Sequence, residues 1–375
     1  MTFTVSSKAI NEALNMISKV IAPKNALPIL DDFILTLEGD TLNITASDTE
    51  NTMTTTVSIT EGDGKGRFAV NAKSMLEAMR NMADVPLTFD YDKKTSKVKV
   101  SYLNGMFSLP TDNADEFPQP RDVTPNLTIN IPETLLQENI ARSIFATAMD
   151  ELRPIMNGIF FDLTEDALNI VATNGHQLVK NKLFSIKATE NNKGTLILPK
   201  KPATILKNIL RKMDTMVTME ADNSWMKLTT ETFTLSCRLI EGRYPNYNSV
   251  IPKNNDRTLT VDRNNLIEVL KRITPFANCS SELMKIHIQQ NCLRIEAEDY
   301  EFAKTATETM AADYDGIDMQ IGFKSSALLG VLDNIKSSEV QILLSDPSRA
   351  GLIQPSEQPE QQEILMLIMP MLLND

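Results

Sequence analysis

Three times the chain returns to one pattern, which reads LNITASD at residues 42–48, LNIVATN at residues 168–174 and LRIEAED at residues 293–299. The opening leucines of these stretches stand 126 and 125 residues apart in a chain of 375 residues. A regular period indicates that one unit has been copied, and this period has the length of a domain rather than of a solenoid repeat. The sequence therefore predicts three tandem domains. We place them at residues 1–125, 126–253 and 254–375.

Each predicted domain begins with a short strand and then a helix whose apolar residues recur at helical spacing. A residue suited to a helix start precedes this helix in each copy, namely Ser6, Pro132 and Asp262. Alternating apolar and polar residues follow, which is the pattern of half-buried antiparallel strands. Each copy thus opens as a strand, a helix and then further strands.

A second helix is predicted in every copy, directly after Lys73, Lys200 and Lys324, which stand 127 and 124 residues apart. Further alternating strands close each copy. Because the order of strand, helix and strands occurs twice per copy, the fold class is predicted to be α+β, with each domain a doubled β-α-β-β-β motif.

The composition is that of a globular protein, with 42% apolar residues, 13 glycines and 18 prolines. No long uncharged apolar run predicts a membrane span. The N-terminus enters a strand-like pattern without the basic start and apolar stretch of a secretion signal, so we expect a cytoplasmic protein. Three cysteines, an odd number without metal-ligand spacing, predict reduced, buried thiols. These are Cys237, Cys279 and Cys292.

The charge is unevenly distributed along the chain. The six predicted helices together carry a net charge of +7 while the whole chain carries −12, so the remainder carries −19. If the helices share one face, that face could hold a phosphate backbone without reading bases. The alternative is that lysines simply cover solvated helix surfaces.

No catalytic constellation is found. The two histidines, His176 and His287, have no acidic or cysteine partner at useful spacing. The glycine-rich stretch GDGKG at residues 62–66 lacks the ending of a phosphate-binding loop and predicts a hairpin turn. The carboxylates Glu296, Glu298 and Asp299 suit a solvated face better than a metal or acid–base site. We therefore expect no enzyme activity, no metal and no cofactor.

Two segments stand out as candidate binding surfaces. The first is ATNGHQL at residues 172–178, for which an Asn-Gly hairpin turn is the structural alternative. The second is the C-terminal stretch 364–373, which is almost wholly apolar and contains three methionines. Its structural alternative is a core strand, but methionine-rich surfaces adapt to varied partners, and an exposed apolar end predicts a binding site.

These segments belong to a series of motifs by which the chain resembles the bacterial sliding clamps, the beta subunits of DNA polymerase III. The resemblance covers the whole length, and six motifs in order on a threefold repeat make it specific. They are LPIL at 27–30, FSL at 107–109, ADEFP at 114–118, ATNGH at 172–176, EGRYPNY at 241–247 and MPM at 369–371.

The resemblance implies a processivity factor without catalysis. In that family a head-to-tail homodimer forms a ring of three domains per chain around duplex DNA, without regard to its sequence. Helices line the hole and sheets form the outside. The replicative polymerase subunit, the clamp loader, and other polymerases and repair proteins bind through short linear peptides, with no membrane partner.

The resemblance also assigns residues to three sites. The partner-peptide pocket comprises Met156, Thr173, Gly175, His176, Leu178, Pro245, Val250, Met369, Pro370 and Met371. The DNA contacts comprise Lys24, Lys73, Arg80, Arg153, Lys200 and Lys201. The dimer interface pairs Phe107 and Leu109 with the region of Ile273 and Phe276.

The chain departs from the family pattern where the family often has basic residues. Gln177, Ser249 and Leu372 stand at those positions, which leaves the partner-peptide preference open. Two other functions remain as alternatives at this stage. One is a monomeric three-domain scaffold that does not encircle DNA, and the other is a hydrolase that uses the carboxylates.

Overall fold

The computed structural model describes residues 1–119 and 121–373. Its contacts divide the chain into two compact units, one comprising residues 1–134 and 204–239 and the other residues 135–203 and 240–375. The second repeat contributes strands to both units. Described α-helices span Ser7–Ile17 (α1), Ala72–Met79 (α2), Glu133–Ser143 (α3), Lys200–Ile209 (α4), Arg263–Ile273 (α5) and Ser325–Asp333 (α6).

The strands of the first unit form two antiparallel sheets. They span Thr2–Ser6 (β1), Asp32–Glu38 (β2), Thr41–Ser47 (β3), Asn51–Ser58 (β4), Glu61–Asp63 (β5), Gly66–Asn71 (β6), Pro86–Asp92 (β7), Lys97–Tyr102 (β8), Gly105–Pro110 (β9), Leu127–Pro132 (β10), Met216–Ala221 (β15), Trp225–Thr229 (β16) and Phe233–Arg238 (β17). The eight-stranded sheet has the order β10-β15-β16-β17-β4-β3-β2-β6, and the five-stranded sheet has the order β5-β1-β7-β8-β9.

The strands of the second unit also form two antiparallel sheets. They span Gly158–Leu163 (β11), Leu168–Thr173 (β12), Gln177–Leu183 (β13), Gly194–Pro199 (β14), Arg257–Asp262 (β18), Leu283–Gln289 (β19), Cys292–Asp299 (β20), Lys304–Ala311 (β21), Asp313–Tyr314 (β22), Met319–Lys324 (β23), Glu339–Leu344 (β24), Gly351–Pro355 (β25) and Gln362–Ile368 (β26). The nine-stranded sheet has the order β14-β11-β12-β13-β26-β25-β24-β18-β22, and the four-stranded sheet has the order β21-β20-β19-β23.

The repeated pattern of the sequence forms β3, β12 and β20, each of which lies inside its sheet. Its leading leucines are all buried in the core, at Leu42, Leu168 and Leu293. The strand that follows the pattern, β4 or β13, pairs with the last strand of the next repeat, β17 or β26. Hydrogen-bonded sheets therefore run without a break from one repeat into the next.

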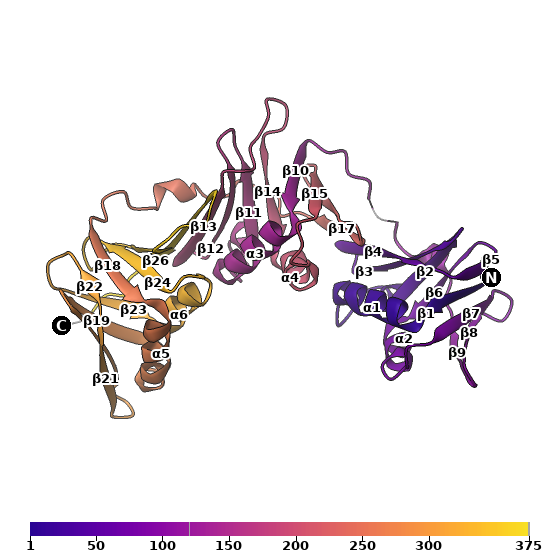
Figure 1. Ribbon diagram of the computed structural model, residues 1–375, viewed down its shortest axis with the longest axis horizontal. Coiled ribbons are helices and arrows are strands. Elements are labelled where there is room, and N and C mark those ends of the chain that lie inside the picture. The colour runs from indigo at the N-terminus through magenta and orange to yellow at the C-terminus, as the bar shows by residue number, and fades with distance from the viewer. Residues whose placement is uncertain (120, 374–375) are drawn as a thin grey trace. The chain divides into compact units, whose positions relative to one another are not determined.

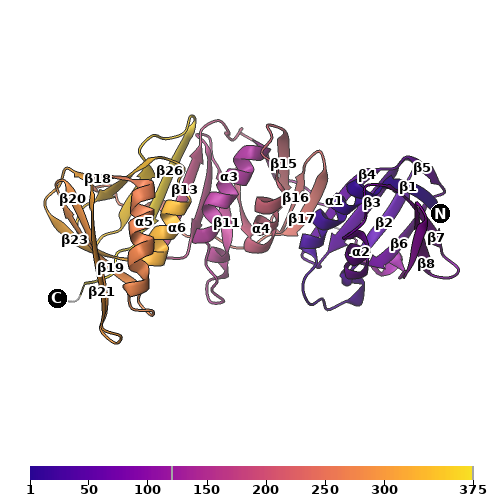
Figure 2. The same cartoon turned by 60° about the horizontal axis from the view of Figure 1, so that its bottom comes forward.

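Helices cover these sheets in both units (Figure 1). In the first unit α1 packs on β3 and β4 and beside α2, and in the second α5 lies beside α6, as Figure 2 also shows. The apolar stripe of α1 is fully buried at Ile10, Leu14 and Ile17. Burying one such side chain contributes roughly 1.5–3 kcal/mol, so packing rather than helix propensity holds these helices in place.

The expected helix starts are mostly confirmed. Ser6 Oγ accepts a hydrogen bond from the Ala9 amide at 3.4 Å, and the Asp262 carboxylate accepts one from the Asn265 amide at 2.7 Å. Such bonds satisfy amides that have no partner inside the helix. Pro132 instead ends β10, and α3 begins one residue later at Glu133.

Two further expectations can be compared with the structure. The stretch 62–66 connects two strands that do not pair with each other, since β5 pairs with β1 and β6 with β2, so the hairpin prediction was wrong. All three cysteines are free, but only Cys237 is buried and Cys279 is exposed. Among the described residues, no helix is long and apolar enough to cross a membrane, and no group of three or more ligands could hold a metal ion.

Candidate functional site

The turn between β12 and β13 is held by its own side chains. Thr173 Oγ1 donates to the carbonyl of Gln177 at 2.7 Å and accepts from the amide of Gly175 at 3.1 Å. The side-chain oxygen of Asn174 accepts from the amides of His176 and Gln177, both at 2.9 Å. Gly175 has a φ of +90°, a left-handed conformation that glycine adopts without strain. The turn therefore presents Gly175 and His176 to solvent in a defined geometry.

The C-terminal segment is attached to this turn. β26 pairs with β13 along its length, and beyond it the Met369 amide donates to the carbonyl of His176 at 2.9 Å. The Met371 amide then donates to the carbonyl of Gly322 at 2.8 Å. Residues 364–368 thus form the core strand that the structural alternative expected, while Met369 lies 43% exposed just past it.

Buried aromatic side chains pack against the turn on its core side. The Tyr244 ring stacks on Phe160 with centroids 4.5 Å apart, and its hydroxyl oxygen accepts a hydrogen bond from the Thr173 amide at 3.1 Å. Burial raises the pKa of Tyr244 to about 12, so this hydroxyl stays neutral. Tyr247 also packs on Phe160 and donates to the Asp162 carboxylate at 2.7 Å.

The structure joins Thr173, Gly175, His176 and Met369, four of the ten predicted pocket residues, by direct hydrogen bonds. Two of the ten, Thr173 and Leu178, are buried, and Leu178 packs in the core beside Tyr244 and Tyr247. Leu178 thus packs beneath the turn, and its place in the pocket stays a prediction. The remaining predicted members are exposed or half-buried, namely Met156, Pro245, Val250, Pro370 and Met371.

Arg153 lies at this turn and not on a helix, unlike the predicted DNA contacts Lys73, Lys200 and Lys201. It precedes a 3₁₀ helix at Pro154–Asn157 and pairs with Asp150 at 2.8 Å. A Cβ added to Gly175 would lie 3.2 Å from its Nη1 atom. Arg153 therefore lies beside the turn, and its assignment to the DNA surface stays a prediction. The aromatic support by Phe160 was also missed, because an apolar run gives no sign of which ring stacks on which.

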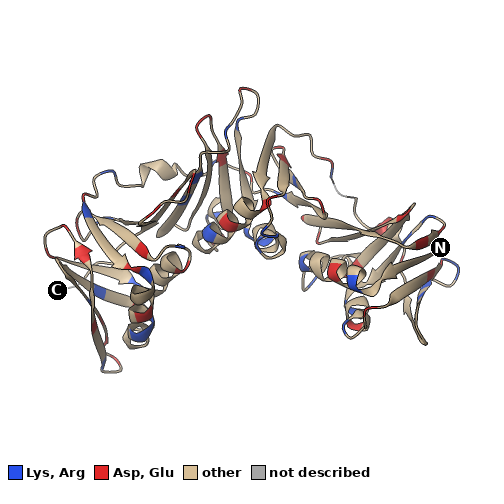
Figure 3. Ribbon diagram, viewed as in Figure 1, with Lys and Arg blue, Asp and Glu red and all other residues tan. Residues whose placement is uncertain are grey.

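The predicted DNA contacts of the first unit gather around α2. Lys73 and Arg80 line a cavity of about 540 Å³ together with Pro23, which directly precedes Lys24. Lys24, Lys73 and Arg80 are all exposed. Lys200 and Lys201 open α4 and are half-exposed. Lysines and arginines lie on helices of both units, alongside acidic residues (Figure 3).

The residues predicted for the dimer interface lie at the ends of two sheets. Phe107 and Leu109 are half-buried on β9, and β9 ends the five-stranded sheet. Phe276 is 39% exposed in a 3₁₀ helix at Thr274–Phe276 that packs on β21, which ends the four-stranded sheet. Ile273 is only 2% exposed and packs in the core of its own domain, so Phe276 is the accessible side chain of this predicted region, and the interface itself stays a prediction.

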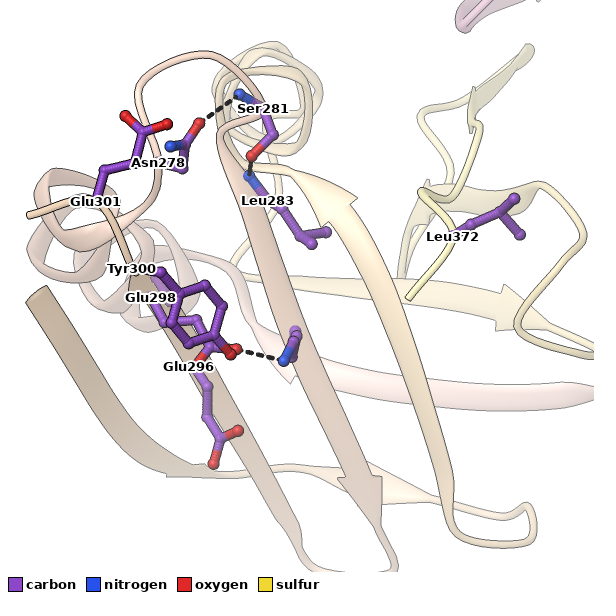
Figure 4. A pocket seen from close by; sticks show the side chains of 10 residues that line it. Asn278, Ser281, Leu283, Glu296, Glu298, Tyr300, Glu301 and Leu372 are labelled. Atoms are coloured by element: carbon purple, nitrogen blue, oxygen red, sulfur yellow. Dashed lines mark hydrogen bonds and ion pairs between the residues drawn. The ribbon is translucent and has the colours of Figure 1, made fainter. Parts of the chain in front are cut away.

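The carboxylates of β20 line a separate cavity of about 380 Å³ (Figure 4). Glu298 pairs with Lys285, which lowers the pKa of the carboxyl group. Glu296 pairs with His287 at 2.9 Å and with Arg294 at 3.0 Å. Since each of these two carboxylates already has a cationic partner, the arrangement favours a structural role over acid–base chemistry.

Comparison with known proteins identifies the family. The chain matches the models of the DNA polymerase III beta subunit N-terminal, central and C-terminal domains at residues 1–121, 130–246 and 248–372. It is 27% identical to the beta sliding clamp of Pseudomonas putida, covering 98% of this chain and 99% of that one, and 26% identical to that of Escherichia coli over 100% of both.

Solved structures agree with these matches. A crystal structure of the DnaN sliding clamp from Pseudomonas aeruginosa bound to griselimycin is 27% identical, with a TM-score of 0.94 over 100% of both chains. The DNA polymerase III beta subunit from Thermotoga maritima is 25% identical, with a TM-score of 0.90 over 100% of both chains. The chain therefore belongs to the DNA polymerase III beta subunit family, the beta sliding clamps, which are processivity factors and not enzymes.

Proposed function

We propose that this chain forms a head-to-tail homodimeric ring that encircles duplex DNA, slides on it without reading its sequence, and tethers DNA polymerase and other partners in the cytoplasm. The observation that carries this proposal is the way in which the three repeats are joined. The last strand of the second repeat, β17, pairs with β4 of the first, and the last strand of the third repeat, β26, pairs with β13 of the second.

This pairing rule leaves one strand of each kind at a sheet end, without a cross-repeat partner among the described residues. β9 is the last strand of the first repeat, and β21 follows the repeated pattern in the third repeat. Exposed strand edges pair readily with another chain. By the same rule, β9 of one chain would pair with β21 of a second chain, and β21 of the first chain would pair with β9 of the second. Each contact is then head-to-tail, and the two contacts together close a ring of two chains.

The side chains on these two strands suit such a contact. On β9, Met106 is 66% exposed, while Phe107 and Leu109 are half-buried. On the side of β21, Phe276 offers a partly exposed ring. A monomeric scaffold would have no reason to leave these apolar side chains on an open strand edge. We therefore favour the ring over the scaffold.

The ring would hold DNA by topology and not by tight contacts. Lys24, Lys73, Arg80, Lys200 and Lys201 would give weak, sequence-independent attraction to phosphates. The excess of acidic residues outside the helices would repel DNA from the outer surface. This combination permits sliding, because no single contact is strong enough to stop it.

The patch around His176, Met369 and Val250 is proposed as the peptide pocket for the replicative polymerase subunit, the clamp loader, and other polymerases and repair proteins. Apolar side chains of the peptide would supply most of the affinity by burial. The hydrogen bond from Met369 to His176 would keep the two sides of the patch in register.

One experiment tests the topological part directly. The protein is loaded onto a nicked circular plasmid by a clamp loader and isolated with the DNA by gel filtration, and the plasmid is then cut once. The ring proposal expects retention on the circle and release after cutting. Equal retention on circular and linear DNA would contradict encirclement.

A further inference from the structure

The turn of the first repeat reproduces that of the second, bond by bond. Ser47 Oγ donates to the Asn51 carbonyl at 3.0 Å and accepts from the Thr49 amide at 3.2 Å, as Thr173 does for its own turn. Asp48 accepts from the amides of Glu50 and Asn51 at 3.1 and 2.7 Å. The φ angle is +80° at Thr49 and +90° at the equivalent Gly175, so both residues have a left-handed backbone. The two turns are therefore the same structure with different side chains.

The strand that joins each turn from the next repeat is also equivalent. The Arg238 amide donates to the carbonyl of Glu50 at 2.8 Å, and the Met369 amide donates to that of His176 at 2.9 Å. Glu50 and Arg238 thus occupy in the first unit the places that His176 and Met369 occupy in the second. The imidazole of His176 and the thioether of Met369 are thus replaced here by a carboxylate and a guanidinium.

A cavity of about 370 Å³ lies at this first junction. It is lined by Thr49 and Glu50 from the turn, by Arg238, by Pro118 and Arg121 from the segment after the first repeat, and by Trp225 of β16. The guanidinium of Arg121 lies 5.7 Å from the centre of the Trp225 ring. Such a stack orients the guanidinium while leaving its N–H groups able to donate.

The second guanidinium in this cavity is only weakly held. Arg238 faces Glu50 at 3.8 Å, with 55% and 66% of the two side chains exposed. An ion pair this exposed contributes little, so a carboxylate of a ligand can compete for Arg238. Arg121 is exposed as well. Guanidinium groups bind carboxylates through paired hydrogen bonds, which gives both affinity and orientation.

We infer that this first junction is a second binding site on the clamp, and that it takes a short acidic peptide segment of a partner protein. Asp48 and Glu50 make the turn beside the cavity acidic. They would repel a continuous phosphate backbone along its length, whereas a peptide can place single carboxylates at Arg121 and Arg238 and uncharged residues beside the two acids, so a peptide is favoured over nucleic acid. The site also occupies the repeat position at which the second junction carries the proposed peptide pocket. Its basic side chains would select partners of different chemistry from that apolar patch.

Trp225 is the only tryptophan of the chain, so its fluorescence reports on this cavity. The full-length protein is titrated with an acetylated peptide of alternating glutamate and leucine, and with the same peptide carrying glutamine in place of glutamate. The inference expects a saturable change in emission with the glutamate peptide and none with the glutamine peptide. Arg121→Gln and Arg238→Gln should each weaken binding roughly tenfold.

The matched control is Lys65→Gln, which removes one exposed positive charge from another turn of the same unit and should leave the binding curve unchanged. Arg121 and Arg238 have exposed side chains, so both variants should fold, which circular dichroism checks. Equal binding of the two peptides would overturn the inference, as would unchanged affinity in both arginine variants. So would displacement by a short oligonucleotide at lower concentration than the peptide. None of these results depends on dimer formation or on DNA encirclement, so the two proposals fail separately.

Discussion

The Met369 amide donates a hydrogen bond to the carbonyl of His176 at 2.9 Å, and so joins the last repeat to the turn of the second. Truncation after Ile368 would remove this bond together with that from Met371 to Gly322. It would also remove the exposed Met369 side chain from the patch, while Val250 would remain. The core strand β26 would remain paired with β13.

We therefore predict that truncation after Ile368, or His176→Ala, weakens binding of a partner peptide by about tenfold or more. Fluorescence anisotropy with a labelled peptide that carries glutamine, leucine and phenylalanine measures this. The chain's other histidine supplies the control, because His287→Ala removes an imidazole from β19 and should leave affinity unchanged. Unchanged affinity in both site variants would refute the assignment of the pocket. The solution mass should stay that of the dimer throughout.

The equivalent turns make an exchange experiment possible. Gly175 and Thr49 share a left-handed backbone, which a β-branched residue adopts only under strain. We predict that Gly175→Thr lowers the free energy of unfolding by about 1–3 kcal/mol. Thr49→Gly should lie between no change and about 2 kcal/mol of stabilisation, since relief of strain opposes the greater freedom of glycine in the unfolded chain. Urea denaturation of both variants measures the pair, and equal destabilisation by both would contradict the argument.

The sequence predicted the fold well because its repeat is long and its strands alternate. Leu42, Leu168 and Leu293 mark three copies of one strand, and each is buried as the alternation requires. Hydrogen bonding across repeats could not be predicted in the same way. Which strand pairs with β26 depends on contacts between segments about 180 residues apart along the chain, and no local pattern records them.

The sequence predicted the turn of the candidate site but not the orientation of the side chains around it. Motifs place Gly175 and His176 in a turn, but they do not tell which neighbouring side chain faces outward. Leu178 and Ile273 both turned inward into cores, and Arg153 lies beside Gly175 rather than with the helical lysines. These outcomes follow from strand register and from loop geometry, which single-sequence spacing does not encode.

If the proposed ring is correct, introducing a single charged side chain at the edge of the five-stranded sheet should dissociate the dimer. Leu109→Asp on β9 would bury a carboxylate against the partner strand without a cation to pair with it. We expect a monomer of 41.8 kDa by light scattering, where the unaltered protein gives twice that mass. Phe276→Asp should do the same from the other side of the contact. Leu103 is 80% exposed in the turn that precedes β9, so Leu103→Asp is the control and should remain dimeric. Dimers in both interface variants would contradict the proposed pairing.

A buried carboxyl in the first unit predicts a pH-dependent stability. Asp32 is 3% exposed, and burial together with the neighbouring Asp112 raises its pKa from 3.8 to about 7. The folded chain therefore binds a proton between about pH 4 and 7 that the unfolded chain has lost, so this group's contribution falls as the pH rises through that window. Asp32→Asn should flatten the decline and stabilise the protein at pH 8 by on the order of 2 kcal/mol. Asp40→Asn, at an exposed position of the same unit, should leave the slope in place. Urea midpoints measured from pH 4 to 8 for the three proteins decide the matter, and an unchanged slope in Asp32→Asn would show that Asp32 is ionised in the folded state.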